Sequence, residues 1–124
     1  MGVAPAVSLD EYFSGHPFAL EVFRTVEAVL ARTGPFSVRV TKSQAAFRRR
    51  RSFAFVWIPG QYLAKPGAEV VLAIALGRHD ASPRFKEVAH PSPRQWIHHL
   101  EVHSVDDVDD EVVRWLLEAA ERAT

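Results

Sequence analysis

The spacing of apolar residues divides the chain into helical ends and a middle made of strands. Ser8 and Glu11 have the spacing of a capping box, which predicts a short helical turn before Gly15. A second helix is predicted to begin at Pro17 and to end at Gly34 and Pro35. One face of that helix carries apolar residues at a period of about 3.6: Phe18, Val22, Val26, Val29 and Leu30.

From Phe36 onwards the apolar positions alternate, which is typical of half-buried strands. Strands are predicted over residues 36–41, 44–48 and 52–58, and the last would place Phe53, Phe55 and Trp57 on one face. Residues 69–76 are almost all apolar, so we expect a central strand that is buried on both faces.

Residues 78–94 contain three prolines and are predicted to be mostly loop, with one short strand over 84–88. Residues 95–103 alternate again. We expect one face of this strand to be buried and the other to be half-exposed. The first face carries Trp96, His98, Leu100 and Val102, and the second carries Ile97, His99, Glu101 and His103.

The last segment returns to helical spacing, with Val108, Val112 and Leu116 on one face. Its acidic start suits the positive end of a helix dipole. The order of elements predicts an α+β fold, with N-terminal helices, an antiparallel β-sheet and a C-terminal helix. We expect one domain over residues 1–124, with residues 1–7 flexible.

Composition narrows the class of protein. The chain has 48% hydrophobic and 24% charged residues, a formal net charge of zero and no cysteine. The lack of cysteine excludes disulfides, thiolate zinc sites and cysteine nucleophiles. No signal peptide and no membrane-spanning run is evident, so we expect a cytoplasmic protein without a membrane partner.

The charges are unevenly placed although they sum to zero. Residues 1–60 hold eight basic and four acidic side chains, and residues 105–124 hold seven acidic and two basic ones. This predicts a dipolar molecule with a basic middle and an acidic terminal helix.

A basic cluster is the first candidate site. Arginine side chains match phosphate and carboxylate groups, so a convergent set could bind an anionic ligand or nucleic acid. The alternative is that the arginines keep a turn soluble, and strand alternation would send neighbours to opposite faces. Nearby aromatics could stack on bases, although their alternation fits core packing better. The candidate ligand-binding residues are Lys42, Arg48, Arg50, Arg84, Lys86 and His98.

The second candidate is a metal site. His99, Glu101 and His103 share one strand face and are a ligand set that zinc accepts, although such positions spread widely along a flat strand. The alternative is a solvated sheet face. His98 is either a hydrogen-bonded core residue or a group for acid–base chemistry. We otherwise expect no metal and no cofactor.

Motifs for phosphate loops, nucleophile elbows and HExxH zinc sites are absent. The leading hypothesis is therefore a binding or accessory module, not an enzyme, whose basic sheet surface meets an anionic ligand, nucleic acid or protein partner. The first alternative is a small enzyme that uses His98, His99, Glu101 and His103. The second is self-association as a homodimer, through the basic hairpin and the acidic helix.

Four stretches carry a resemblance to a known family: the early HP pair, VTKSQAAFRRRRSFAFVWIP, ASPRFKEV and WIHHLEVHSVDDVDDEVVRWLLEAA. From about His16 onwards the chain resembles a bacterial domain family of unknown function. That family occurs alone or at the C-terminus of predicted transport proteins. The closing strand and acidic helix are more loosely similar to the MmcQ/YjbR double-wing proteins, which are described as DNA-binding-like. The resemblance implies a fold and carries no catalytic residues.

Overall fold

The computed structural model describes residues 7–124 and forms an α+β fold. The expected flexibility of residues 1–7 falls, apart from Val7, outside the described residues. Helices α1 (Leu9–Tyr12) and α2 (Pro17–Ala31) come first, six strands follow, and helix α3 (Asp110–Arg122) ends the chain. The predicted fold class is confirmed.

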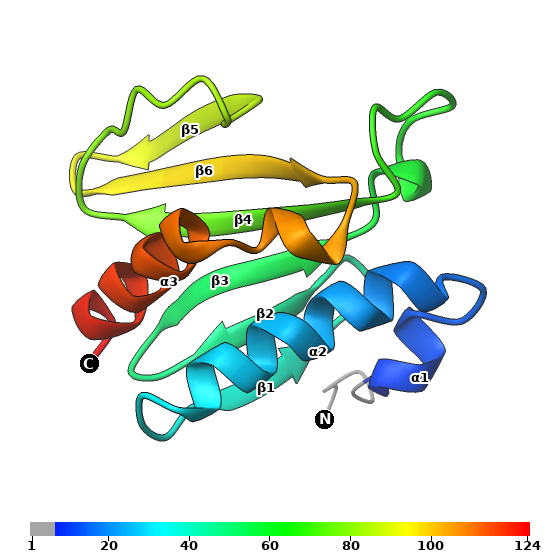
Figure 1. Ribbon diagram of the computed structural model, residues 1–124, viewed down its shortest axis with the longest axis horizontal. Coiled ribbons are helices and arrows are strands. Elements are labelled where there is room, and N and C mark those ends of the chain that lie inside the picture. Colours follow the sequence, from blue (N-terminus) through cyan, green and yellow to red (C-terminus); the bar gives the residue numbers. More distant parts are fainter. Residues whose placement is uncertain (1–6) are drawn as a thin grey trace, which may run out of the picture.

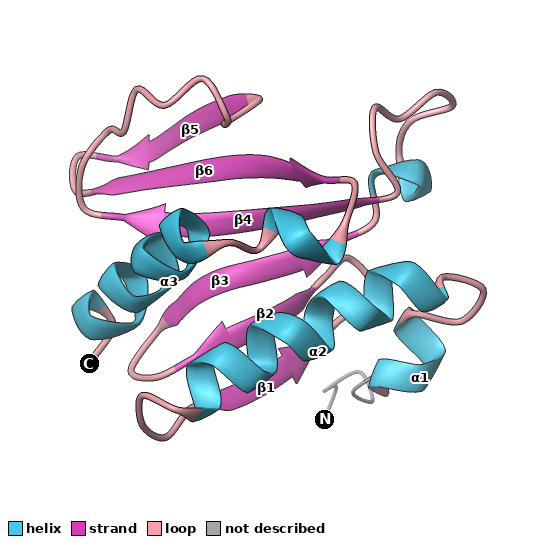
Figure 2. Ribbon diagram, in the orientation of Figure 1, coloured by secondary structure: helices cyan, strands magenta, loops and turns pink. Residues whose placement is uncertain are grey.

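The six strands form one antiparallel sheet in the order β1-β2-β3-β4-β6-β5. Their bounds are β1 Ser37–Val40, β2 Ala45–Arg48, β3 Ser52–Trp57, β4 Val70–Leu76, β5 Glu87–Ser92 and β6 Gln95–Val102. Two 3₁₀ turns, η1 (Pro59–Gln61) and η2 (Val105–Asp107), lie in connections. Helices α2 and α3 lie across the same face of the sheet (Figures 1 and 2). No described α-helix covers the opposite face, which we call the uncovered face.

The short first helix forms as the sequence predicts. The Ser8 hydroxyl accepts a hydrogen bond from the Glu11 backbone, and the Glu11 carboxylate accepts one from the Ser8 backbone. Gly15 then takes a φ of 79°, a conformation that glycine adopts without steric cost. Pro17 begins α2, whose buried side chains include Val22, Phe23 and Val26.

The core lies between the two long helices and the covered face of the sheet. Strand β4 lies between β3 and β6 and is buried along its whole length, as predicted. Its Val70, Leu72, Ile74 and Leu76 join the core cluster with α2 and α3. The other β4 side chains point to the uncovered face and are also buried.

A bulge in β3 changes the face of the sheet on which Phe53 lies. Phe47 pairs with Ala54 and Arg48 pairs with Ser52, which leaves Phe53 as the extra residue. Phe53 is 1% exposed and belongs to the core cluster. Phe55 remains on the uncovered face. The prediction that Phe53 would share a face with Phe55 and Trp57 is therefore wrong, because alternation fails at a bulge.

Strand β5 lies later than predicted, over Glu87–Ser92 instead of residues 84–88. Phe85 donates a backbone hydrogen bond to the carbonyl of Ser82, so this stretch forms a turn. Strand pairing begins only where Glu87 faces His99. Pro91 is tolerated because β5 is an edge strand, where not every backbone N–H needs a partner.

Residues 7–124 include no helix that has both the length and the hydropathy to cross a membrane.

Candidate functional site

The residues of the predicted basic cluster do not gather at one place. Lys42 lies in the turn between β1 and β2, at one end of β2, whereas Arg48 and Arg50 lie at its other end. His98 lies on β6, separated from β2 by β3 and β4, and its side chain is fully buried. Lys42 and His98 therefore share no cleft.

His98 uses both ring nitrogens within the fold. Its Nε2 accepts a hydrogen bond from the backbone N–H of Asp80 at 2.9 Å. Nδ1 must then carry the proton, and it lies 3.1 Å from the carbonyl oxygen of Trp96. Burial lowers the pKa of His98, which keeps the ring neutral. This histidine holds the connection between β4 and β5 and has no free nitrogen for proton transfer.

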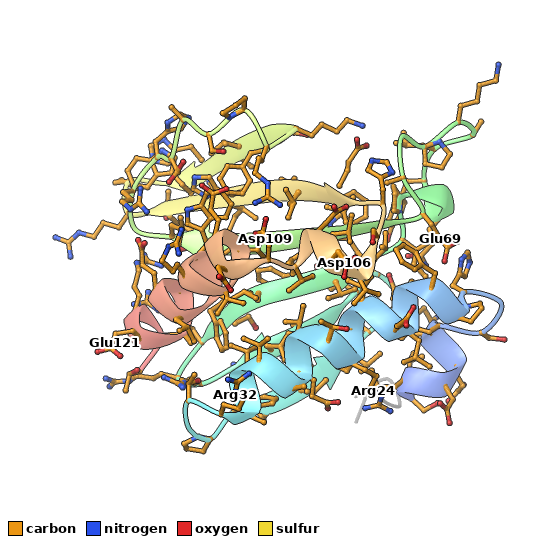
Figure 3. The ribbon with its side chains drawn as sticks, in the orientation of Figure 1. Arg24, Arg32, Glu69, Asp106, Asp109 and Glu121 are labelled. Atoms are coloured by element: carbon orange, nitrogen blue, oxygen red, sulfur yellow. The ribbon has the colours of Figure 1, made fainter. Side chains whose placement is uncertain are left out.

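Arg84 and Lys86 are each paired with carboxylates. Arg84 contacts Asp109 and Glu111 at 2.9 Å and donates to the carbonyl oxygen of Asp107. Asp109 lies beside the start of α3 (Figure 3). Lys86 forms an ion pair with Glu101 at 2.9 Å. These cations therefore tie residues 84–86 to α3 and β6.

The arginine turn between β2 and β3 meets the C-terminal ends of two helices. Arg49 donates to the carbonyl oxygens of Thr33, after α2, and Ala120, in the last turns of α3. The backbone N–H of Arg50 donates to Ala123, and Arg51 donates to Arg122. Helix C-termini carry partial negative charge and unpaired carbonyls, so this turn serves as a cap for α3 and ties it to the segment that follows α2.

Arg48 and Arg50 form no ion pair with any of residues 7–124. They border a cleft of about 440 Å³, which we call the arginine cleft. Its lining is Thr33, Pro35, Phe36, Ser37, Arg48, Arg49, Arg50 and Thr124.

The three predicted metal ligands do not come together. Within residues 7–124 no group of three histidine or carboxylate side chains is placed to hold a metal ion. Glu101 is paired with Lys86, and His103 lies beyond the end of β6. His99 instead points into a pocket on the uncovered face.

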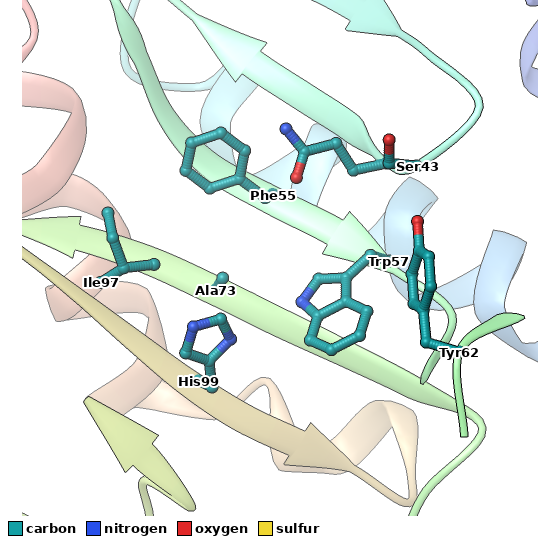
Figure 4. Close-up of a pocket in the computed structure, with 8 residues that line it drawn as sticks. Ser43, Phe55, Trp57, Tyr62, Ala73, Ile97 and His99 are labelled. Carbon is teal, nitrogen blue, oxygen red and sulfur yellow. The ribbon is translucent and has the colours of Figure 1, made fainter. Parts of the chain in front are cut away.

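This pocket, which we call the sheet pocket, has a volume of about 380 Å³. Strand pairing places Ala46, Phe55, Ala73 and His99 in one row across β2, β3, β4 and β6. Small alanines between larger side chains make the surface concave. The pocket is lined by Ser43, Gln44, Phe55, Trp57, Tyr62, Ala73, Ile97 and His99 (Figure 4).

The His99 ring supplies polar atoms to a largely apolar lining. It meets the indole of Trp57 edge to face, with the ring centroids 5.9 Å apart. Its Nδ1 is buried without a hydrogen-bond partner, and burial lowers the pKa of the ring. Its Nε2 forms no hydrogen bond with the described residues. The pocket thus contains a neutral imidazole with unused hydrogen-bonding capacity.

Tyr12 of α1 holds two segments that border the sheet pocket, through hydrogen bonds of its hydroxyl group. Its hydroxyl lies 2.8 Å from both the Ser43 carbonyl oxygen and Gln61 Oε1, and it accepts from the Ile58 backbone N–H at 3.2 Å. Gln61 in turn donates to the carbonyl of Lys42. Helix α1 therefore fixes both the β1–β2 turn and η1, which border the pocket. Burial raises the pKa of Tyr12 to about 12.

The alternation of residues 95–103 predicts His99 on the half-exposed face of its strand, and the burial of β6 confirms that placement. The sheet pocket is not predictable in this way, because nothing in the sequence pairs residue 73 with residues 55 and 99. The available signal was a pair of small residues, Ala73 and Ala75, in a strand whose other residues are larger.

Comparison with known protein families gives a match over most of the chain. A family model with the description "Domain of unknown function (DUF5655)" matches residues 9–122. No curated protein and no solved structure matches the chain. Bacterial origin, a transport context and similarity to double-wing proteins stay predictions.

Proposed function

Because the chain belongs to the family of DUF5655 domains, described as domains of unknown function, we propose a role from its own geometry. The domain is a binding module that holds a planar aromatic group in the sheet pocket. The observation that carries this proposal is an apolar, concave lining on a sheet face that no helix of residues 7–124 covers.

An uncovered face of an antiparallel sheet is normally polar, because it meets water. Here its centre is apolar, and Val71, Ala73 and Ala75 of β4 are at most 4% exposed. Aromatic side chains that stand around small ones leave a slot in which a flat ring gains contact on several sides. Ligand pockets commonly combine such a lining with a few polar groups.

Binding accounts for the pocket better than catalysis does. General acid–base chemistry needs a positioned proton donor or acceptor near the reacting group. The lining holds one imidazole, His99, and one phenol, Tyr62, but no carboxylate. His98, another histidine of the enzyme hypothesis, is engaged by Asp80 and Trp96 on the opposite side of the sheet.

The arginine cleft supports a second candidate function, the binding of a small anion. Arg48 and Arg50 are free of carboxylate partners among the described residues, and hydroxyls of Ser37 and Thr33 lie in the same lining. The helix ends capped by Arg49 place carbonyl groups beside this cleft, which weakens its attraction for anions. A double variant, Arg48→Gln with Arg50→Gln, should lose phosphate-induced NMR shifts. Equal shifts in the parent and the variant would rule the cleft out.

The sheet pocket can be tested with a matched pair of variants. Tyr62 is 60% exposed and lines the pocket, whereas Leu63 is 49% exposed and does not. We expect planar aromatic fragments to shift the indole N–H signal of Trp57 and cyclohexane analogues to shift it little. Tyr62→Ala should weaken binding several-fold, and Leu63→Ala should leave it unchanged. Equal binding of aromatic and saturated fragments, or equal effects of both variants, would refute the proposal.

A further inference from the structure

The uncovered face has a basic side next to the sheet pocket. Arg39 is exposed on β1 and pairs with Ala46 of β2, which in turn pairs with Phe55. Neighbouring strands lie about 4.8 Å apart, so the Cα atoms of Arg39 and Phe55 are separated by about 10 Å. A long arginine side chain spans much of that distance.

Arg48 lies on the same side of the face. It pairs with Ser37, which is two residues from Arg39 and therefore points the same way. Within residues 7–124 neither Arg39 nor Arg48 takes part in an ion pair. Arg48, however, lines the arginine cleft, which shares no lining residue with the sheet pocket. Arg39 is therefore the guanidinium group that is available toward the sheet pocket.

The opposite side of the uncovered face has a different charge. Glu87 of β5 pairs with His99, and Glu101 of β6 is held by Lys86. The face therefore runs from positive at β1 and β2, through the aromatic pocket, to neutral or negative at β6 and β5. A bound molecule with a ring and an anionic group would be oriented by this gradient.

We propose that the ligand of the sheet pocket is a planar aromatic ring that carries a phosphate, with the ring between Phe55, Trp57 and His99 and the phosphate toward Arg39. This inference rests on the proposed function and names its ligand class. Aromatic side chains stack on bases of any sequence, and the arginine fork matches phosphate oxygens. A free nucleotide and one base of a single-stranded nucleic acid both present this chemistry.

The test compares adenosine, AMP, inorganic phosphate and a hexadeoxyadenylate on the whole chain, by calorimetry and by NMR of the Trp57 indole. We expect AMP to bind about tenfold more tightly than adenosine, which corresponds to about 1.4 kcal/mol, and phosphate alone to leave the indole signal unshifted. Raised salt should narrow the difference between AMP and adenosine, because the phosphate contact is exposed. If AMP and adenosine bind equally, the inference is overturned and the pocket proposal stands.

A matched pair of arginine variants locates the phosphate. Arg39→Gln should lower the affinity for AMP to that for adenosine, and it should leave the affinity for adenosine unchanged. Arg32→Gln removes the same charge at the end of α2, in the helix layer (Figure 3). It should change the affinity for neither adenosine nor AMP. Equal effects of the two variants would show a general charge effect and overturn the inference.

The affinity for the hexadeoxyadenylate distinguishes a free nucleotide from a single-stranded nucleic acid as the ligand. Binding that is clearly tighter than that of AMP would assign a single-stranded nucleic acid, whereas equal or weaker binding would assign a free nucleotide. If aromatic fragments bind but neither adenosine nor AMP does, the ligand class is wrong while the proposed function remains. If no aromatic compound binds at all, both fail.

Discussion

The backbone N–H of Asp80 donates a hydrogen bond to Nε2 of His98 across 2.9 Å, which joins the β4–β5 connection to β6. The Asp80 carboxylate also accepts from the indole N–H of Trp115 at 3.1 Å. Phe85 packs on both rings, with centroids 4.7 Å from His98 and 4.5 Å from Trp115. A buried histidine is thus the attachment point for the polar connection between β4 and β5.

This arrangement makes stability depend on pH. Burial lowers the pKa of both His98 and His99 in the folded chain below the ordinary value of 6.5. The unfolded chain therefore binds more protons just below pH 6.5, and acid favours unfolding. The free energy of unfolding should be level between about pH 7 and 9 and should fall as the pH drops from 6.5 toward 5. Urea denaturation at several pH values measures this slope.

His98→Gln is the matched variant for this prediction. A glutamine side chain reaches the position of Nε2 with an amide oxygen that can accept from Asp80, but it does not titrate. The slope between pH 6.5 and 5 should become shallower in this variant. An unchanged slope would mean that His98 does not titrate on unfolding in this range.

The arginine turn leads to a second prediction. Arg49 donates to groups at the ends of α2 and α3 at once, through both terminal nitrogens. Lysine has a single ammonium group and cannot reach both ends. Arg49→Lys should lower the free energy of unfolding by about 1–3 kcal/mol, since hydrogen bonds to a charged group are lost. Chemical denaturation measures the change.

Arg50→Lys is the control, because only the backbone of Arg50 is bonded to a helix end, through Ala123. Its stability should stay within about 0.5 kcal/mol of the parent. If the free energy of unfolding falls by the same amount in both variants, the capping role assigned to Arg49 is wrong.

Much of the fold was predictable because periodicity reports burial directly. The alternation in β6 placed His98 and Leu100 on the buried side and His99 on the other, as the structure confirms. The uniform apolar run of β4 likewise predicted a strand buried on both faces. The bulge at Phe53 escaped prediction, because it depends on how the β2–β3 turn closes and not on residue type.

The candidate site was less predictable, because it depends on which strands become neighbours. The sequence order places β5 before β6, yet β6 lies beside β4 and brings His99 opposite Ala73. The uneven distribution of charge was visible in the sequence, but the ion-pair partners of the charged residues were not. Arg78 and Arg84, which lie outside the basic stretch, pair with Glu118, Asp109 and Glu111, so the acidic helix is partly neutralised by other residues than those the charge pattern suggested.

A third prediction concerns Arg84 and its carboxylate partners. Its side chain is 29% exposed and contacts Asp109, the N-cap of α3, together with Glu111. Arg84→Gln should therefore destabilise the fold by about 1–2 kcal/mol, because the loop and the helix start lose a shared contact. Lys86→Gln removes a single, more exposed pair with Glu101 and should cost less than about 1 kcal/mol. Thermal unfolding of both variants measures the two losses of stability, and equal losses would contradict the prediction.

The last prediction concerns Tyr12, which supports the rim of the sheet pocket. Its hydroxyl accepts from the buried N–H of Ile58 and bonds to Ser43 or Gln61, so Tyr12→Phe should cost about 1–3 kcal/mol of folding stability.

The same residue predicts an alkaline limit to stability. The pKa of Tyr12 is about 12 in the folded chain against an ordinary value of 10.0. The unfolded chain therefore loses this proton first, and stability that is fully present below pH 10 should decline as the pH rises from 10 toward 12. Tyr12→Phe should make that decline shallower, which denaturation at pH 9 and 11 will show. If the decline is unchanged, other groups cause it. Weaker binding of aromatic fragments by Tyr12→Phe at pH 7, where the variant is still folded, would separately show that α1 positions the pocket rim.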